Sequence, residues 1–276
     1  MQRPIRSTLA LIFARKIFYK INRQILLFAL RNIGCFNLET KYDLSGEKWF
    51  LSKLNFLLKK NDENIIMDIG ANIGEYSKDI LELENQSKIF AFEPHPTHFK
   101  SLCKNLSNNN NIELINKGCS NENATLKIYD IKRNNNEFGY TMDKKYLEWL
   151  KKDDDIIVEK DVEVIILDEF IDKNKIKKIH LLKIDVEGYE LNVLKGLENS
   201  LNNNIINIIQ FEFNVHNIDN KVFMRDFFEI LTNYNLFRLL PNSLLPIDKS
   251  DPPFLVEIFG YQNIIAINKS YEVNFN

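Results

Sequence analysis

The sequence predicts an α/β fold with a mostly parallel sheet, helices on both faces and an additional helical arm at the N-terminus. Short apolar runs rich in β-branched residues alternate with amphipathic segments of helical length along most of the 276-residue chain. The runs are continuously apolar, as expected for strands that are covered on both faces. No stretch rich in Gly, Pro or Ser divides the chain. We therefore expect an arm at residues 1–45 and a single domain at residues 46–276.

The arm is basic and rich in apolar residues between about residues 5 and 32. Its apolar runs are far shorter than the roughly 20 residues that a spanning helix requires. No small-residue cleavage site of a secretory signal follows them. We expect either a helix that packs on the domain or on a partner subunit, or peripheral contact with a membrane through Arg and Lys side chains.

The first half of the domain is predicted to begin with a helix at Ser45 or Gly46, with apolar residues at helical spacing. Strands and helices then alternate. The predicted strands are 64–70, 88–95, 112–120 and 124–131, and the predicted helices after the first are 75–84 and 96–109.

The second half begins with a polar, irregular section at about 130–160. A strand that runs into a short helix is predicted at 161–171. Further strands are predicted at 180–188, 204–214, 236–241 and 263–268, with helices at 189–201 and 222–234. The last two strands follow each other without a clear helix, so we expect one of them to be antiparallel.

Charge and cysteine content exclude several classes of protein. The net charge of −2 gives no global attraction to nucleic acid or to an anionic membrane. Cys35, Cys103 and Cys119 lack the spacing of a disulfide framework or of a zinc site, which indicates a reducing, cytoplasmic compartment.

The stretch "MDIGANIG" at 67–74 forms the first strand-to-helix turn, where α/β sheets commonly hold a ligand. Gly70 and Gly74 would let the backbone approach that ligand, and Asn72 tolerates left-handed geometry. A dinucleotide turn would read GxGxxG, and Asp68 would repel a pyrophosphate. A sulfonium nucleoside with an ammonium group would instead be attracted. The turn therefore favours S-adenosylmethionine over a dehydrogenase cofactor.

Glu93 ends the second predicted strand, about 20 residues after the turn, where a carboxylate can accept both ribose hydroxyls.

Four segments in this order and spacing carry a family resemblance: "MDIGANIGEYS", "AFEPHPTHFKSL", "LLKIDVEGYELNVLKGL" and "IQFEFN". Together they resemble the FkbM-type methyltransferases, which are class I, S-adenosylmethionine-dependent O-methyltransferases with a Rossmann-like fold. The resemblance runs from about residue 46 to 267. It implies a seven-stranded sheet whose last strand is antiparallel. The cofactor contacts that we expect on this basis are Asp68, Gly70, Ala71, Asn72, Gly74, Tyr76, Glu93, Pro94, Cys119, Ser120 and Asp185.

Within this resemblance, Cys119 and Ser120 should lie near the adenine. Superfamily members often carry an acid there, so Ser120 departs from the pattern.

Candidate catalytic residues follow the fourth and fifth predicted parallel strands. Asp185 and Glu187 end "KIDVEG", and strand alternation points them to the same side. Glu212 and His216 end or follow "IQFEFNVH". Either Asp185 or His216 is expected to take the proton of an acceptor hydroxyl, with Asp185 preferred by its location. Glu190 is expected to help cap the following helix.

Asp185, Glu212 and Asn214 also offer oxygen ligands for Mg²⁺, although a metal-free site is favoured. We expect the acceptor to be a small molecule or a glycan, with sugar hydroxyls of a bacterial surface polysaccharide preferred over lipid or natural-product hydroxyls. A dehydrogenase-like nucleotide-binding protein and a catalytically silent binding protein are the alternatives. Four aromatic residues would either stack on a sugar or pack in the core: Phe138, Tyr140, Tyr146 and Trp149.

Overall fold

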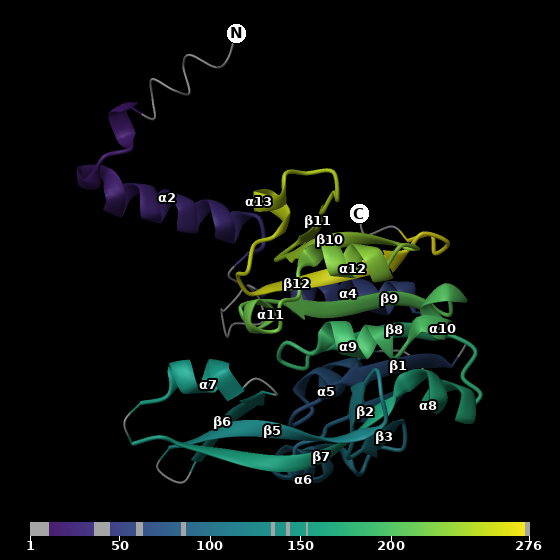
Figure 1. Ribbon diagram of the computed structural model, residues 1–276. Coiled ribbons are helices and arrows are strands. Elements are labelled where there is room, and N and C mark those ends of the chain that lie inside the picture. The colour runs from purple at the N-terminus through teal and green to yellow at the C-terminus, as the bar shows by residue number, and fades with distance from the viewer. Residues whose placement is uncertain are drawn as a thin grey trace.

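The computed structural model describes residues 11–35, 45–58, 63–83, 87–133, 136–141, 144–152 and 154–273. Figure 1 shows a large twisted sheet with helices on both faces, a smaller sheet along one edge and an N-terminal arm that projects from the body.

The larger sheet has the strand order β11-β10-β12-β9-β8-β1-β2-β3. Its strands are β1 (Asn64–Ile69), β2 (Ser87–Phe92), β3 (Ile112–Ile115), β8 (Ile179–Ile184), β9 (Ile206–Phe213), β10 (Tyr234–Leu240), β11 (Ser243–Pro246) and β12 (Gln262–Asn268). The five strands from β3 to β9 in this order pair in parallel. β12 is antiparallel to both of its neighbours, β9 and β10. The predicted antiparallel last strand is therefore confirmed. The short strand β11 at the sheet edge was not predicted, and it adds an eighth strand to the expected seven.

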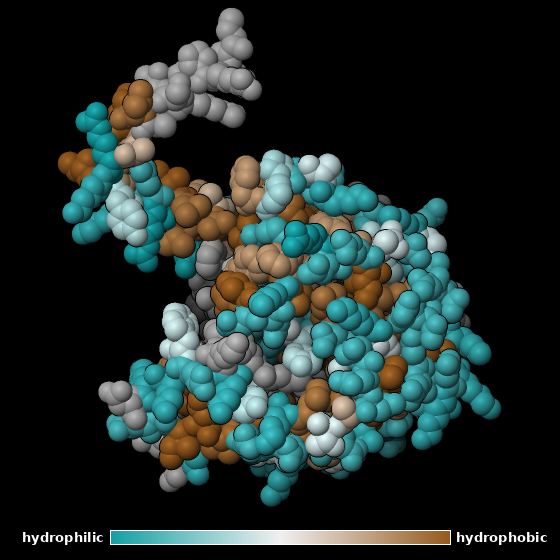
Figure 2. All heavy atoms as spheres, in the orientation of Figure 1, coloured by the Kyte–Doolittle hydropathy of each residue, from teal (hydrophilic) through white to brown (hydrophobic). Residues whose placement is uncertain are grey.

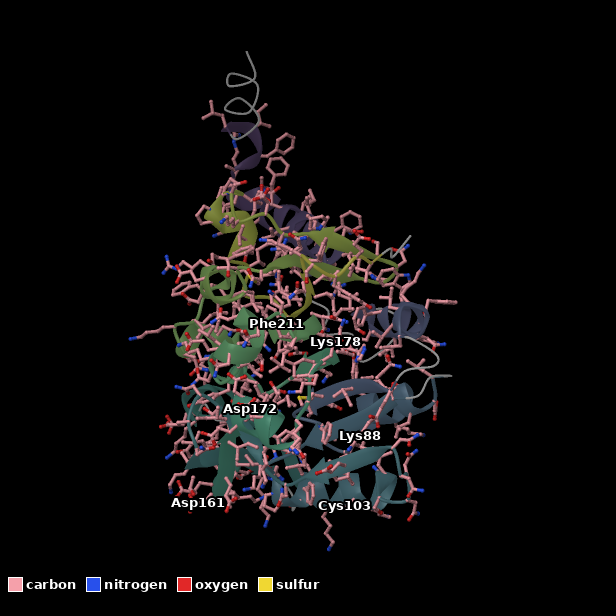
Figure 3. All side chains as sticks on the ribbon, turned by 90° about the vertical axis from the view of Figure 1, so that its right-hand side faces the viewer. Lys88, Cys103, Asp161, Asp172, Lys178 and Phe211 are labelled. Carbon is pink, nitrogen blue, oxygen red and sulfur yellow. The ribbon has the colours of Figure 1, made fainter. Side chains whose placement is uncertain are left out.

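Two hydrophobic clusters fill the two sides of this sheet. One side is covered by α4 (Glu47–Leu57), α5 (Glu75–Leu81) and α6 (Pro96–Leu106). The other is covered by α8 (Leu167–Lys173), α9 (Glu190–Lys195), α10 (Glu198–Asn202) and α12 (Met224–Ile230). Phe211, labelled in Figure 3, lies completely buried in the second cluster. Apart from α9 and α10, which were predicted as one helix, these helices agree with the sequence prediction, including a start at Gly46 for α4.

The smaller sheet corrects the prediction for the middle of the chain. The segment 112–120 is not one strand, because β3 belongs to the larger sheet whereas β4 (Gly118–Ser120) pairs with β7 in the smaller one. The smaller sheet has the order β4-β7-β5-β6, with β5 (Ala124–Arg133), β6 (Asn136–Thr141) and β7 (Ile156–Ile166). The section 130–160 is therefore largely regular, and it also contains α7 (Lys144–Leu150).

The helix predicted at 189–201 is broken into α9 and α10 at Gly196. A Cβ atom at Gly196 would lie 2.1 Å from the Ser120 carbonyl oxygen, so this position lies directly against β4. α10 then begins with its own cap, because the Asp168 carboxylate accepts hydrogen bonds from the amides of Asn199 (2.8 Å) and Ser200 (3.1 Å).

The described part of the arm contains a short 3₁₀ turn, η1 (Lys16–Phe18), and α2 (Tyr19–Asn32). Residues 5–10 of the expected helical region lie outside the described part. The arm joins the body at Gly34 and Cys35, which are buried, whereas α2 has no buried residue. Within the described ranges, no helix has the length and apolar character needed to cross a membrane.

Candidate active site

A row of polar side chains crosses the middle of the larger sheet on the face covered by α4 and α5. Asp68 of β1 is paired in register with Lys183 of β8, and Lys183 is paired with Gln210 of β9. All three side chains are almost completely buried. Their strand neighbours Ile66, Leu181 and Ile208 belong to the same side of the core. Strand alternation therefore places one acid, one base and one amide side by side in an otherwise apolar layer.

Helices α4 and α5 provide partners for this row. Ser77 donates a hydrogen bond to Asp68 Oδ2 (2.7 Å), and Tyr76 donates one to Gln210 Oε1 (2.6 Å). The Gln210 amide donates in turn to Glu47 Oε1 (3.1 Å). The other oxygen of Asp68, Oδ1, is buried without a hydrogen-bond partner.

Beyond the row, a small cavity opens at the carboxyl ends of β1 and β8, with a volume of about 210 Å³. Its lining consists of Glu47, Gly70, Ala71, Asn72, Ile73, Glu75, Tyr76, Lys183 and Asp185. Five of the residues predicted to contact a cofactor are therefore brought together here. Larger depressions exist on the surface, but they lie away from the carboxyl ends of the parallel strands.

Lys183 is the centre of the charge distribution in this cavity. Its ammonium donates to Asp185 Oδ2 at 2.8 Å and lies 4.9 Å from the centre of the Tyr76 ring. Burial alone lowers the pKa of this lysine, but the carboxylates of Asp185, Asp68 and Glu47 together raise it above its ordinary value. The lysine therefore stays protonated and holds three acids around one cation.

Burial lowers the pKa of the lysine but raises the pKa of two of these acids. It raises the pKa of Asp68 and of Glu47, while the nearby Lys183 ammonium counteracts part of that increase.

The glycines of the first turn have a structural role in addition to the predicted approach to a ligand, which stays a prediction. Gly70 and Gly74 both have positive φ angles, +86° and +91°. A Cβ atom at Gly70 would lie 1.8 Å from the Asp185 carbonyl oxygen, and one at Gly74 would lie 2.6 Å from Leu102 and Leu106 of α6. Both glycines are thus required by close contacts within the protein. The contact of Gly70 brings the ends of β1 and β8 together, and those of Gly74 bring the turn against α6.

Asn72 adopts the left-handed geometry that was expected, with φ at +52°. Its amide donates to Glu93 Oε2 at 2.8 Å, and the His95 amide donates to Glu93 Oε1 at 2.7 Å. Glu93 is completely buried here. The carboxylate therefore fixes the first turn against β2, and its contact with a ribose stays a prediction.

Three further cofactor residues lie outside the cavity. Pro94 is buried directly after Glu93. Cys119 and Ser120 in β4 are 2% and 1% exposed, and burial raises the pKa of the Cys119 thiol. Ser120 donates to Asn121 Oδ1 (3.2 Å). An adenine contact at these positions stays a prediction, because neither residue reaches the cavity surface.

A second group of ionisable residues surrounds the loop after β8. Glu187 Oε2 lies 3.1 Å from His216 Nε2, and the side chain of Glu187 is 42% exposed whereas that of His216 is 5% exposed. Glu187 has a positive φ of +53°, so the strand alternation used in the prediction ends before it. Asp185 and Glu187 therefore have different partners, Lys183 and His216. Strand alternation, on which the prediction relied, does not determine where these two side chains lie.

Glu190 and Glu212 complete this second group. Glu190 Oε1 accepts hydrogen bonds from the amides of Val186 (3.1 Å) and Gly188 (3.2 Å), so it closes the loop that precedes α9. Burial raises the pKa of Glu190 to about 7, despite these hydrogen bonds. Burial and the neighbouring Asp185 carboxylate raise the pKa of Glu212 well above its ordinary value.

The arrangement of these acids does not resemble a metal centre. Within the residues that the structure describes, no three His, Cys, Asp or Glu side chains are placed to hold an ion. Asn214, the third ligand considered from sequence, donates to Glu212 Oε2 (3.0 Å), and its own carbonyl oxygen accepts from the His216 amide (2.9 Å). Asn214 thus stabilises the start of α11 (His216–Asp219).

Sequence analysis missed Lys183, Gln210 and Glu47 as members of the site. A lysine within "HLLKIDV" and a glutamine within "NIIQFEF" stand out, because Lys and Gln are rarely fully buried unless they are paired. Lys183 and Asp68 each precede the last residue of their strand. Parallel register brings such positions together, which was the available signal.

Comparison with known proteins agrees with this geometry. A family model described as a methyltransferase FkbM domain matches residues 68–238. The chain is 30% identical over 160 residues to Methyltransferase 1 of Beauveria bassiana, covering 54% of this chain and 64% of that protein. It is 25% identical over 162 residues to hexuronic acid methyltransferase AglP of Haloferax volcanii (58% and 59% covered). It is 27% identical over 154 residues to 2-O-methyltransferase NoeI of Sinorhizobium fredii (52% and 61% covered). The matched region spans less than two thirds of each relative.

Proposed function

Because the chain belongs to the FkbM methyltransferase family, we propose that it transfers a methyl group from S-adenosylmethionine to a hydroxyl oxygen of a sugar or another small acceptor. Its fold is the Rossmann-like class I methyltransferase fold, with the antiparallel strand β12 inserted between β9 and β10. The observation that carries the proposal is the cavity at the carboxyl ends of β1 and β8, lined by Gly70, Ala71, Asn72 and Asp185.

The residues of this cavity fit a cationic ligand. S-adenosylmethionine supplies an electrophilic methyl group on a positively charged sulfur. Three carboxylates surround the one ammonium of Lys183, and Asp68 keeps one buried oxygen without a hydrogen-bond partner. Carboxyl groups thus outnumber the one ammonium, with Glu47, Glu75 and Asp185 in the lining and Asp68 buried beside it, and this excess favours a sulfonium and an ammonium group. Glu93 lies directly behind the Asn72 amide and is the residue that would meet a ribose.

The volume of about 210 Å³ is below the roughly 300–1,000 Å³ that is typical of small-molecule sites. Ligand entry therefore requires side chains at the rim to move. Asn72 and Ile73, both exposed at the tip of the first turn, are placed to do so.

For the acceptor, we propose that the Glu187–His216 pair takes the hydroxyl proton. The Glu187 carboxylate is exposed, and the buried His216 behind it can share the proton over 3.1 Å. Asp185, the residue preferred from sequence, is engaged by Lys183 and is better placed to orient the ligands of the cavity. Glu212 lies half-buried beside these groups, and burial together with the Asp185 carboxylate favours its neutral form.

Two relatives support a sugar acceptor, because their names specify a hexuronic acid and a 2-O position. A bacterial surface polysaccharide is the acceptor that we propose within this class. Trp149 on α7 is 79% exposed and offers an aromatic face for a sugar ring. The side chains of Phe138, Tyr140 and Tyr146 lie outside the described part of the structure. With a net charge of −2, the chain offers no overall attraction to a nucleic-acid acceptor.

We also propose that the protein works in the cytoplasm, at or near the inner face of a membrane. Its three cysteines are unpaired, and two of them are buried, which suits a reducing compartment.

Calorimetric titration with S-adenosylhomocysteine, with NAD as the comparison ligand, tests the cofactor. We expect binding of S-adenosylhomocysteine alone and at least tenfold weaker binding in Glu93→Ala, because a charged hydrogen bond contributes about 1.5–3 kcal/mol. Glu113→Ala, which removes an exposed carboxylate from the neighbouring strand β3, is the control and should bind normally. Binding of NAD alone, or of neither ligand, would reject the proposal.

Turnover measurements with a sugar acceptor test the proton-accepting pair. Glu187→Gln should lower kcat by about 10²–10⁴-fold and leave the affinity for S-adenosylhomocysteine unchanged, because the base acts only on the acceptor. If Asp185→Asn lowers kcat as strongly while Glu187→Gln has less than a tenfold effect, Asp185 is the base instead.

A further inference from the structure

The described part of the arm carries a stripe of exposed apolar side chains. Ile17, Ile21, Ile25 and Phe28 are 80%, 58%, 59% and 70% exposed. Their spacing of four, four and three residues places them on one face of a helix. Isolated exposed apolar residues are common on protein surfaces, but a continuous stripe marks a surface that contacts something apolar.

The charge of the same segment has only one sign. Residues 11–35 contain five basic residues and no acid. The basic residues are Arg15, Lys16, Lys20, Arg23 and Arg31, all exposed. Figure 2 shows brown apolar and teal hydrophilic residues alternating along the projecting arm. Tyr19 and Leu26 are also exposed away from the stripe (65% and 57%). A helix that combines an apolar face with exposed Lys and Arg has the composition of helices that lie in the interface of an anionic bilayer.

A second exposed apolar segment lies at the base of the arm. Phe254 and Leu255 of α13 (Pro253–Val256) are 74% and 45% exposed. The Arg238 guanidinium donates to the Leu255 carbonyl oxygen (2.9 Å) and to Gln262 Oε1 (2.7 Å), and the Cys35 thiol donates to the same Gln262 oxygen (3.9 Å). The end of the arm and α13 are thus fixed to one buried pair. Figure 1 shows α13 beside the C-terminal end of α2.

We propose that the arm and α13 together form a membrane-binding surface for anionic lipid, with the apolar stripe and Phe254 inserted among the acyl chains and the arm's Lys and Arg at the headgroups. A second copy of the arm is a poorer occupant, because two identical segments of charge +5 would repel each other. This surface would account for the proposed location of the protein at the inner face of a membrane. The proposal does not depend on methyl transfer, so failure of lipid binding and failure of cofactor binding can be told apart.

Sedimentation of the full chain with lipid vesicles tests this surface. We expect binding to vesicles that contain phosphatidylglycerol, weak binding to phosphatidylcholine alone, and release at high salt. Lys20→Gln and Arg23→Gln should each weaken binding about fivefold, since each basic residue near an anionic surface contributes about that factor. The double variant Ile21→Ser/Ile25→Ser should abolish sedimentation, and Phe254→Ser should reduce it.

Phe56→Ser is the matched control, because Phe56 is 85% exposed on α4 and lies outside the proposed surface. Its binding should equal that of the unchanged protein. The proposal is overturned if the full chain does not sediment with anionic vesicles, or if Phe56→Ser weakens binding as much as the arm variants. It is also overturned if ultracentrifugation shows a dimer that Ile21→Ser/Ile25→Ser dissociates while vesicle binding is absent.

Discussion

Basic side chains occupy two opposite settings in this protein, the interior of the candidate active site and the projecting arm. Lys183 is 6% exposed and is surrounded by Asp68, Asp185 and Glu47. The five basic residues at 11–35 are exposed and have no acid within their own segment. A buried charge is stable only when it is paired, whereas an exposed charge is stabilised by water. The buried lysine therefore holds the surrounding carboxyl groups in place. The exposed basic residues of the arm remain available to bind a partner.

Replacement of Lys183 by Met should break the buried setting and have the largest effect on stability. Three carboxylates would remain together without their cation, and loss of one partner of a buried ion pair costs about 3–5 kcal/mol. The measurement is the free energy of unfolding from urea titration at neutral pH. Lys78→Met is the control, because Lys78 pairs with Glu82 on the surface of α5, with both side chains more than 60% exposed. Its cost should be about 0–1 kcal/mol.

Equal losses of unfolding free energy in Lys183→Met and Lys78→Met would contradict the difference proposed between buried and exposed lysines. A loss in Lys183→Met that disappears when the pH falls to about 4 would strengthen it, because protonation of the surrounding carboxyls removes their repulsion.

Glu190 provides an intermediate effect, since it is buried and accepts hydrogen bonds from two backbone amides, those of Val186 and Gly188. Its pKa is about 7 in the folded protein, above its ordinary value near 4.5, so the folded state binds the proton more tightly. This group therefore stabilises the folded state as the pH falls from about 7 toward 4.5, and its contribution declines as the pH rises through that window. Unfolding of the unchanged protein should show this negative slope, of up to about 1.4 kcal/mol per pH unit.

In Glu190→Gln, the free energy of unfolding should fall less steeply with rising pH, because one titrating carboxyl is gone. The part of the slope due to Glu212 should remain, because the pKa of Glu212 is raised in the same direction. Urea titrations between pH 4.5 and about 7.5 would measure both proteins. An unchanged slope in Glu190→Gln would show that this carboxyl titrates normally in the folded state.

The contrast also explains what the sequence could predict. Apolar runs and their spacing predicted the parallel sheet and an antiparallel strand near its end, because these features depend on local periodicity. The ligand position at Gly70 stays a prediction. The roles of Lys183 and Gln210 depend on register across three strands, which no local pattern specifies. The split of 112–120 between two sheets likewise depends on where β7 lies, some forty residues further along the chain.

For the glycines, the structure adds a reason that the sequence did not indicate. Gly70 was assigned to ligand approach, which stays a prediction, and it is also required by the nearby Asp185 carbonyl oxygen. Approach of a ligand and close contact with the protein backbone both require glycine, so the sequence alone does not separate the two explanations. The contact becomes visible only when the ends of β1 and β8 are seen side by side.

The smallest effect on stability is expected in the arm, where it separates apolar side chains that are exposed from those that pack in the core. Ile25→Ala removes a side chain that is 59% exposed and contacts no core cluster, so the free energy of unfolding should change by less than about 0.5 kcal/mol. Leu54→Ala on α4 is the matched substitution in the interior, where the side chain is 0% exposed, and it should cost about 2–5 kcal/mol. A loss of vesicle binding in Ile25→Ala without any loss of stability would show that the arm's apolar residues are retained for a partner. A destabilisation comparable to that of Leu54→Ala would instead mean that the arm packs against the body in solution, and the exposed stripe would then need no lipid to cover it.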